Sequence, residues 1–198
     1  MIAAIYLLVF LTLYFIIVFV IPSLRVKRKT GINPYVFKNT DSPQDYIAKV
    51  LTAINIVIFA VVLLNLLFPE GLQYLATFIW LEISILKYAG FALIHLALLW
   101  IVIAQIQMSN SWRVGIDHSV KTELKTNGLF SVSRNPVFLG MLITLVGIFL
   151  ILPNAITLLI LISSILLLQI QTRLEEEYLK NTHREIYIEY CSKVGRWV

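Results

Sequence analysis

The residues best suited to chemistry lie within residues 127–140, where a polar loop runs directly into an apolar segment. Asn135 and Pro136 mark the junction. Proline loses no hydrogen bond at the first helical position and moves the preceding residue out of helical geometry, so we expect Asn135 to be the N-cap. The free N–H groups and positive dipole end of this helix favour a carboxylate or phosphate, and Gly140 would let such a ligand approach the backbone. The loop therefore predicts an anion-binding site.

A run of acidic residues, 175–177, follows the next apolar segment, residues 154–172. Only a Pro-Asn dipeptide separates that segment from the preceding one, residues 136–152, and so short a connection predicts an antiparallel helical hairpin. Its helices would pack roughly 8–10 Å apart, which brings the polar loop next to the acidic run. We also expect Glu176 to pair with Lys180, four residues later on the same helix.

The composition places the chain in a bilayer. Its 198 residues are 59% hydrophobic and 14% charged, which excludes an ordinary soluble domain. A helix needs about 20 apolar residues to cross about 30 Å of hydrocarbon. We predict an all-α integral membrane protein with about five transmembrane helices, a C-terminal helical hairpin and a cytoplasmic tail helix. The predicted spans are residues 2–21, 46–68, 87–107, 136–152 and 154–172. Residues 72–86 are apolar but carry Glu82, so they are interfacial, re-entrant or an early part of the third span.

The basic residues indicate the topology. A cluster at residues 25–29 follows the first span, and Lys87 is the one basic residue near the opposite side. The positive-inside rule then predicts an outside N-terminus and a cytoplasmic polar loop, acidic run and C-terminus. The net charge of +5 does not indicate nucleic acid, because the basic residues lie beside apolar spans. Cys191 is the only cysteine and the three histidines are scattered, so we expect no metal site.

Two motifs carry a family resemblance. The first is Gly128-x-Phe130 followed by Ser133-Arg134-Asn135-Pro136-x-Phe138-x-Gly140, and the second is Glu175-Glu176-x-x-Leu179. Together they resemble the C-terminal half of the isoprenylcysteine carboxyl methyltransferase family of integral-membrane enzymes, which is related to the phospholipid N-methyltransferases. The resemblance extends from about Trp112 to Trp197. It departs from the family's usual R-H-P-x-Y-x-G motif at Asn135 and Phe138, and Thr122 stands where many members have a histidine.

The resemblance implies S-adenosylmethionine as the cofactor, bound within residues 108–198 of a single domain whose first 107 residues hold three spans. The expected cofactor-binding residues are Leu124, Lys125, Gly128, Phe130, Asn135, Pro136, Phe138, Leu139, Gly140, Glu175 and Glu176. The expected substrate-binding residues are Trp112, Tyr187 and Tyr190. Arg173 and Arg134 are the candidates to hold an acceptor carboxylate, and Arg173 is preferred because it lies at the end of a span.

Methyl transfer from a sulfonium group is an in-line displacement, so the protein mainly aligns donor and acceptor and excludes water. A carboxylate acceptor is already ionised and needs no base, whereas an amine needs a group such as a Glu or Tyr to take its proton. The family name suggests a prenylcysteine carboxylate, but a phospholipid or another lipophilic or lipidated molecule is equally compatible with the sequence. Besides this substrate we expect only membrane lipids as partners, and the oligomeric state stays open.

Other functions and plainer roles stay open at this point. Membrane sterol reductases share a similar C-terminal region that binds NADPH, and a non-catalytic lipid-binding or scaffold protein is a third class. The arginines at the membrane ends are also typical of side chains that reach lipid headgroups, and the acidic run is typical of a solvated helix. Gly140 is equally compatible with close helix packing. His95, in the middle of a span, is either functional or bonded to a neighbouring helix.

Overall fold

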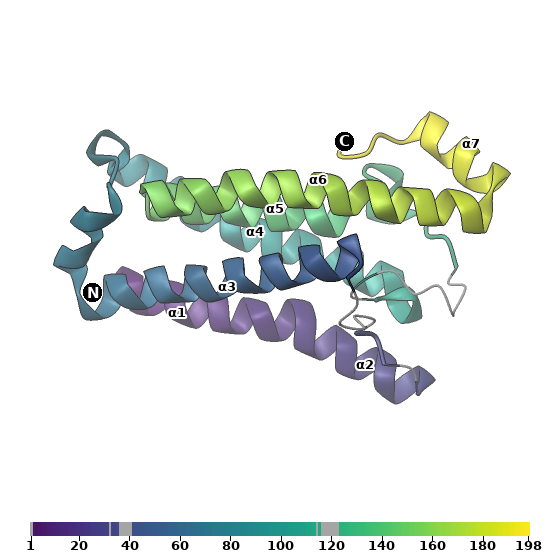
Figure 1. The fold of residues 1–198 in the computed structure, drawn as a ribbon, viewed down its shortest axis with the longest axis horizontal. Helices are drawn as coiled ribbons and strands as arrows, with labels where there is room; N and C mark the ends of the chain where they lie inside the picture. Colours follow the sequence, from purple (N-terminus) through teal and green to yellow (C-terminus); the bar gives the residue numbers. More distant parts are fainter. Residues whose placement is uncertain (1, 32, 36–40, 114, 116–122) are drawn as a thin grey trace.

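The computed structural model describes residues 2–31, 33–35, 41–113, 115 and 123–198. Within these ranges nearly all regular structure is helical, and the only β feature is an isolated bridge between Thr77 and Asn154. The α-helices are α1 (Ile2–Phe15), α2 (Ile21–Thr30), α3 (Pro43–Leu67), α4 (Ser84–Met108), α5 (Pro136–Ile151), α6 (Ala155–His183) and α7 (Glu185–Lys193). The long helices run roughly side by side as an elongated bundle (Figure 1). The all-α prediction is confirmed.

The first span is longer than predicted. The π-helical turn Ile16–Val20 joins α1 to α2, so one helix continues through Pro22 to Thr30 instead of ending before the basic cluster. Proline cannot donate to the carbonyl of Val18 four residues earlier, which normally weakens a helix. The buried side chain of Gln105 donates to this carbonyl at 2.7 Å and removes most of that penalty.

In the part of the chain that the structure describes, four helices are long and apolar enough to cross a membrane: Ile2–Thr30, α3, α4 and α6. The remaining predicted span is α5, which has only 16 residues and a length of about 24 Å at 1.5 Å per residue. Because α5 packs between α4 and α6, its ends are covered by protein. The protein is thus an integral membrane protein with four to five spanning helices, as the composition predicts. Helix α6 continues past the fifth predicted span to His183, so the charged residues from Arg173 onward are helical.

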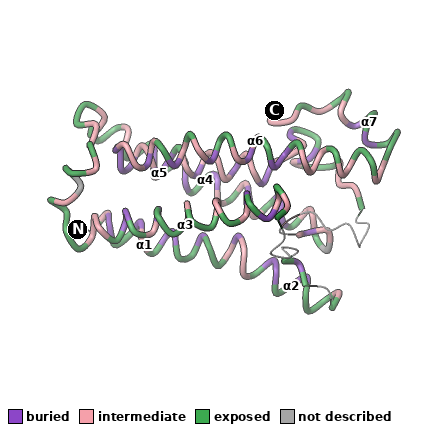
Figure 2. The backbone as a smooth tube through the Cα atoms, viewed as in Figure 1, coloured by how far each residue is buried: buried purple, intermediate pink, exposed green. Residues whose placement is uncertain are grey.

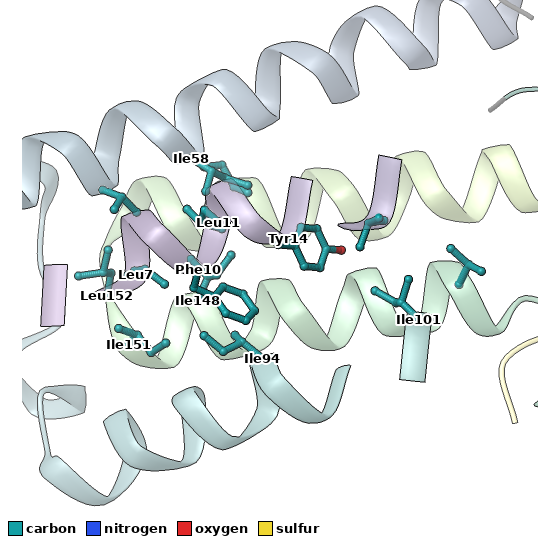
Figure 3. Packing of buried hydrophobic residues seen from close by; sticks show 14 of the residues in the cluster. Leu7, Phe10, Leu11, Tyr14, Ile58, Ile94, Ile101, Ile148, Ile151 and Leu152 are labelled. Atoms are coloured by element: carbon teal, nitrogen blue, oxygen red, sulfur yellow. The ribbon is translucent and has the colours of Figure 1, made fainter. Parts of the chain in front are cut away.

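Helices α4 and α5 form the tightest pair of the bundle. A Cβ atom on Gly140 would lie 2.4 Å from Ile101, and one on Gly147 would lie 2.8 Å from the carbonyl oxygen of Gly90. These contacts confirm the packing role for Gly140. Buried side chains of α1 and α3 complete the core beside this pair. Figure 3 shows Phe10, Leu11 and Tyr14 of α1 and Ile58 of α3 together with Ile94, Ile101 and Ile148 of α4 and α5. Many residues on the outer faces are exposed (Figure 2), and many of the exposed residues are large and apolar, as expected for lipid contact.

The turn between α5 and α6 lies at one end of the bundle, with the N-terminus (Figure 1). Asn154 caps α6 through the amides of Ile156 and Thr157. The 3₁₀ turns Pro69–Leu75 and Ile79–Leu81 pack against this turn, and the amide of Phe78 donates to the Pro153 carbonyl at 2.8 Å. Most of residues 72–86 therefore form a surface segment at this end, and the last three begin α4.

The opposite end of the bundle gathers α2, residues 123–135, α7 and the C-terminus (Figure 1). These are the segments that the charge pattern assigns to one side of the membrane. His95 lies far from them, on α4. Its Nδ1 is 2.7 Å from the Phe91 carbonyl oxygen and its Nε2 is 2.7 Å from the Tyr6 hydroxyl, so a neutral ring satisfies both contacts and ties α4 to α1.

Candidate active site

Two cavities meet at the polar end of the bundle. The larger, about 450 Å³, is mostly apolar and reaches between α1, α3, α5 and α6 as far as Leu11, Ile58 and Ile148. The smaller, about 140 Å³, lies between residues 123–134, the end of α6 and α7. We call the residues that line both cavities the junction: Met108, Arg113, Gly115, Phe130, Arg134 and Glu175. The two cavities therefore share part of their wall, and the smaller one has the higher proportion of charged side chains.

The start of α5 has the expected backbone but not the expected cap. Asn135 occupies the N-cap position with a non-helical φ of −130°, and Pro136 follows at the first helical position. The Asn135 side chain makes no capping bond, so that part of the prediction was wrong. Its Nδ2 instead donates to the Arg196 carbonyl at 3.2 Å, because the C-terminal tail folds back beside it. Ser133 Oγ accepts the Asn135 amide at 3.2 Å.

An ion cluster joins three separate segments beside the junction. Arg196 Nε donates to Glu176 Oε1 at 3.0 Å and Arg196 Nη2 to Oε2 at 2.7 Å. Arg134 Nη2 lies 3.2 Å from Glu176 Oε1. The side chains of Arg134 and Glu176 are each only 13% exposed. The predicted proximity of the polar loop and the acidic run is confirmed, but the Glu176–Lys180 pair is not among the ion pairs of the described residues.

The acidic run divides by position on α6. Glu177 is exposed, Glu176 turns to the arginines, and Glu175 lines both cavities. Glu175 Oε1 accepts a hydrogen bond from Gln171 Nε2 at 2.9 Å, and no ion pair of the described residues includes Glu175. A carboxylate at the junction with a neutral partner remains able to bind a cationic ligand. The solvated-helix interpretation therefore holds for Glu177 alone.

The structure separates the two arginines that the sequence put forward for the acceptor. Arg134 lines both cavities, and its buried Nε has no hydrogen-bond partner among the described residues. Arg173 is exposed and lines neither cavity. Its Nη1 donates to the carbonyl and the side-chain oxygen of Gln169, at 2.9 and 2.8 Å, one turn earlier on the same helix. The geometry therefore favours Arg134 and gives no support to Arg173.

Most of the other expected residues line a cavity. Leu124, Lys125, Tyr187 and Tyr190 line the smaller one, Trp112, Asn135, Pro136 and Phe138 line the larger one, and Phe130 lines both. Gly128, Leu139, Gly140 and Glu176 line neither. Gly128 has a φ of +65° and lies against Gln107, whose Oε1 accepts the Leu129 amide at 2.8 Å, so it shapes the loop. Thr122 lies outside the described residues.

The tyrosines of α7 close the smaller cavity. Tyr190 donates from its hydroxyl to the Phe130 carbonyl at 2.5 Å, and burial raises the pKa of Tyr190 to about 12. Burial, followed by the nearby charge of Glu176, also raises the pKa of Tyr187. Both hydroxyls therefore stay protonated at neutral pH and do not serve as bases there. Glu175 is the only carboxyl group among the described residues that lines both cavities.

Several residues of this site were missed from the sequence. Arg196 gave no local signal, because a chain reversal after α6 brings it to Glu176. Arg113 lies in a polar connector with no recognisable motif, yet it lines both cavities. Gln171 was detectable, because a residue four positions before Glu175 on a helix shares its face.

A model of the phospholipid methyltransferase family matches residues 85–186. The match covers α4, the polar loop, α5 and α6, and thus most of the junction. Together with the helical bundle it defines an integral-membrane methyltransferase. The chain belongs to the phospholipid methyltransferase family, which lies in one superfamily with the isoprenylcysteine carboxyl methyltransferases, so the resemblance is confirmed at that level. Comparison with curated proteins finds no match.

Proposed function

We propose that the protein transfers a methyl group from S-adenosylmethionine to the polar end of a lipophilic acceptor at the junction. The observation that carries this proposal is the meeting, at Arg134 and Glu175, of a large apolar cavity and a smaller cavity with several charged side chains in its wall. An acceptor with a hydrocarbon chain fits the larger cavity, whose walls are apolar. A charged cofactor fits the smaller cavity and the junction.

The charged and aromatic side chains of the site suit S-adenosylmethionine. When bound, this cofactor supplies an electrophilic methyl group on its sulfonium. Arg134 has an unpartnered Nε for the cofactor carboxylate, and Glu175 presents a carboxylate for its ammonium or sulfonium group. Phe130 offers an apolar surface for the adenine ring. At about 140 Å³ the smaller cavity is below the roughly 300 Å³ at which small-molecule sites begin, so the cofactor would extend into the junction.

The acceptor decides which side chains act on it. A carboxylate acceptor would be held by Arg113, because Arg134 is assigned to the cofactor carboxylate, and it would need no base. An amine would lose its proton to Glu175, because the two tyrosines of α7 stay protonated. The family match makes a phospholipid the first acceptor to test, and a prenylated cysteine the second.

Thermal unfolding in detergent tests the class of ligand. S-adenosylhomocysteine should raise the unfolding temperature at concentrations well above its dissociation constant, whereas NADPH should not. Stabilisation by NADPH alone would favour a sterol-reductase-like enzyme. Stabilisation by neither compound would favour a non-catalytic lipid-binding protein.

We also propose that the junction faces the cytoplasm, because the basic cluster of α2 lies at the same end of the bundle. In intact cells, an impermeant thiol reagent should label a cysteine introduced beside Pro153. A cysteine beside Lys193 should stay unlabelled. The reverse pattern would place the site outside.

A further inference from the structure

The last five residues, 194–198, form a strap that crosses the start of α5. Its backbone accepts three hydrogen bonds from the polar loop. The Arg134 amide donates to the Gly195 carbonyl at 3.1 Å, and Asn135 Nδ2 and Ser133 Oγ donate to the Arg196 carbonyl at 3.2 and 3.5 Å. In Figure 1 the C-terminus lies beside α6, turned back from α7. The strap therefore touches the loop that carries Arg134.

The strap also brings a second arginine, Arg196, to the carboxylate that pairs with Arg134. Glu176 has two carboxylate oxygens, and Arg196 engages both of them, through Nε and Nη2. Arg134 makes one ion-pair contact with Glu176, from Nη2 at 3.2 Å, and its side chain lines both cavities. Arginine and carboxylate groups prefer a bidentate pairing when both are available. Without Arg196, Glu176 would be free to pair bidentately with Arg134.

We propose that Arg196 is a positioning residue. By occupying Glu176 it prevents the carboxylate from drawing Arg134 out of the junction, and so keeps the Arg134 guanidinium directed at the ligand. This inference rests on the proposed function, in which Arg134 binds the cofactor carboxylate. It assigns the C-terminal strap a part in ligand binding although Arg196 lines neither cavity.

The test compares S-adenosylhomocysteine affinity by calorimetry in the parent and four purified variants. Arg196→Gln should weaken binding about tenfold, the size expected for one charge-assisted contact. Adding Glu176→Gln to it should recover much of that loss, because no carboxylate is left to capture Arg134. Lys193→Gln, which removes an exposed ion pair of α7, should bind like the parent. Arg196→Lys keeps the charge but loses the fork, so it should lie between the parent and Arg196→Gln and replaces the latter if that variant does not fold.

The outcomes separate this inference from the proposed function. If the parent does not bind S-adenosylhomocysteine, the proposed function fails. If the parent binds but Arg196→Gln binds equally well, only the positioning role fails. If the double variant binds no better than Arg196→Gln, Arg196 acts through general stability instead of through Glu176, and the inference is overturned.

Discussion

Glu175→Gln perturbs the junction most sharply, because it removes one charge with almost no change in shape. Gln171 can still hydrogen-bond to an amide in that position, so we expect the fold to persist. Two opposite charges 4 Å apart attract by about 4 kcal/mol at an effective dielectric constant of about 20. A hydrogen bond to a charged group is worth about 1.5–3 kcal/mol net. The smaller of these two energies, that of the hydrogen bond, predicts roughly 10- to 100-fold weaker binding of a cationic ligand.

Two related ligands show which cationic group Glu175 contacts. S-adenosylmethionine carries a sulfonium and an ammonium group, whereas S-adenosylhomocysteine carries only the ammonium. If Glu175 contacts the sulfonium, Glu175→Gln should weaken the first ligand by roughly 10- to 100-fold and leave the second nearly unchanged. If it contacts the ammonium, both should weaken equally. Isothermal titration calorimetry measures both values.

The matched control is Glu177→Gln, which removes the same charge two residues later from an exposed position that lines neither cavity. It should bind both ligands like the parent. If Glu175→Gln also binds both ligands like the parent, Glu175 does not face the cofactor and the role assigned to the junction is refuted. Equal weakening in both variants would indicate long-range electrostatics and would contradict a direct contact.

Three further variants test the packing and the arginine assignment. Gly140→Ala should destabilise the fold by about 1–3 kcal/mol, because its Cβ would lie 2.4 Å from Ile101, and thermal unfolding measures this. Gln105→Met should cost about 1–3 kcal/mol by leaving the buried Val18 carbonyl without its donor, and unchanged stability would contradict our account of the first span. Arg173→Lys should change neither cofactor affinity nor turnover, and a fall in turnover would restore the role expected from its place at a span end.

Local composition and short connections predicted much of the architecture. Apolar length located the spanning helices, and the Pro-Asn connection predicted the hairpin that brings Arg134 to Glu176. Contacts between distant residues were not predictable in this way. The first helix passes Pro22 because Gln105, 87 residues after Val18, donates to the freed carbonyl. Such a contact depends on how two helices pack, which no local pattern contains.

In the candidate site, too, local sequence predicted the position of residues along a helix but not their contacts with distant residues. The position of each glutamate along α6 decides which of them faces the cavities. The Glu-Glu-x-x-Leu motif located the turn of α6 that carries them. The side-chain partners were harder to predict, because Glu176 had a nearby lysine on its own helix and a more distant arginine in the tail. Arg196 reaches it in a buried setting where a bidentate pair is favourable, whereas Lys180 is exposed. Burial decided the pairing, and burial is a property of the folded chain.

Methyl transfer itself tests the central claim most directly. Purified protein in phospholipid vesicles should be incubated with S-adenosylmethionine that carries a radioactive methyl group, and the lipids then extracted with organic solvent. The account predicts label in the lipid fraction for the parent and much less for Glu175→Gln at matched protein concentration. The same assay with a prenylated cysteine analogue covers the second acceptor. A parent protein that binds S-adenosylhomocysteine but labels neither acceptor would contradict transfer to a lipophilic molecule at the junction.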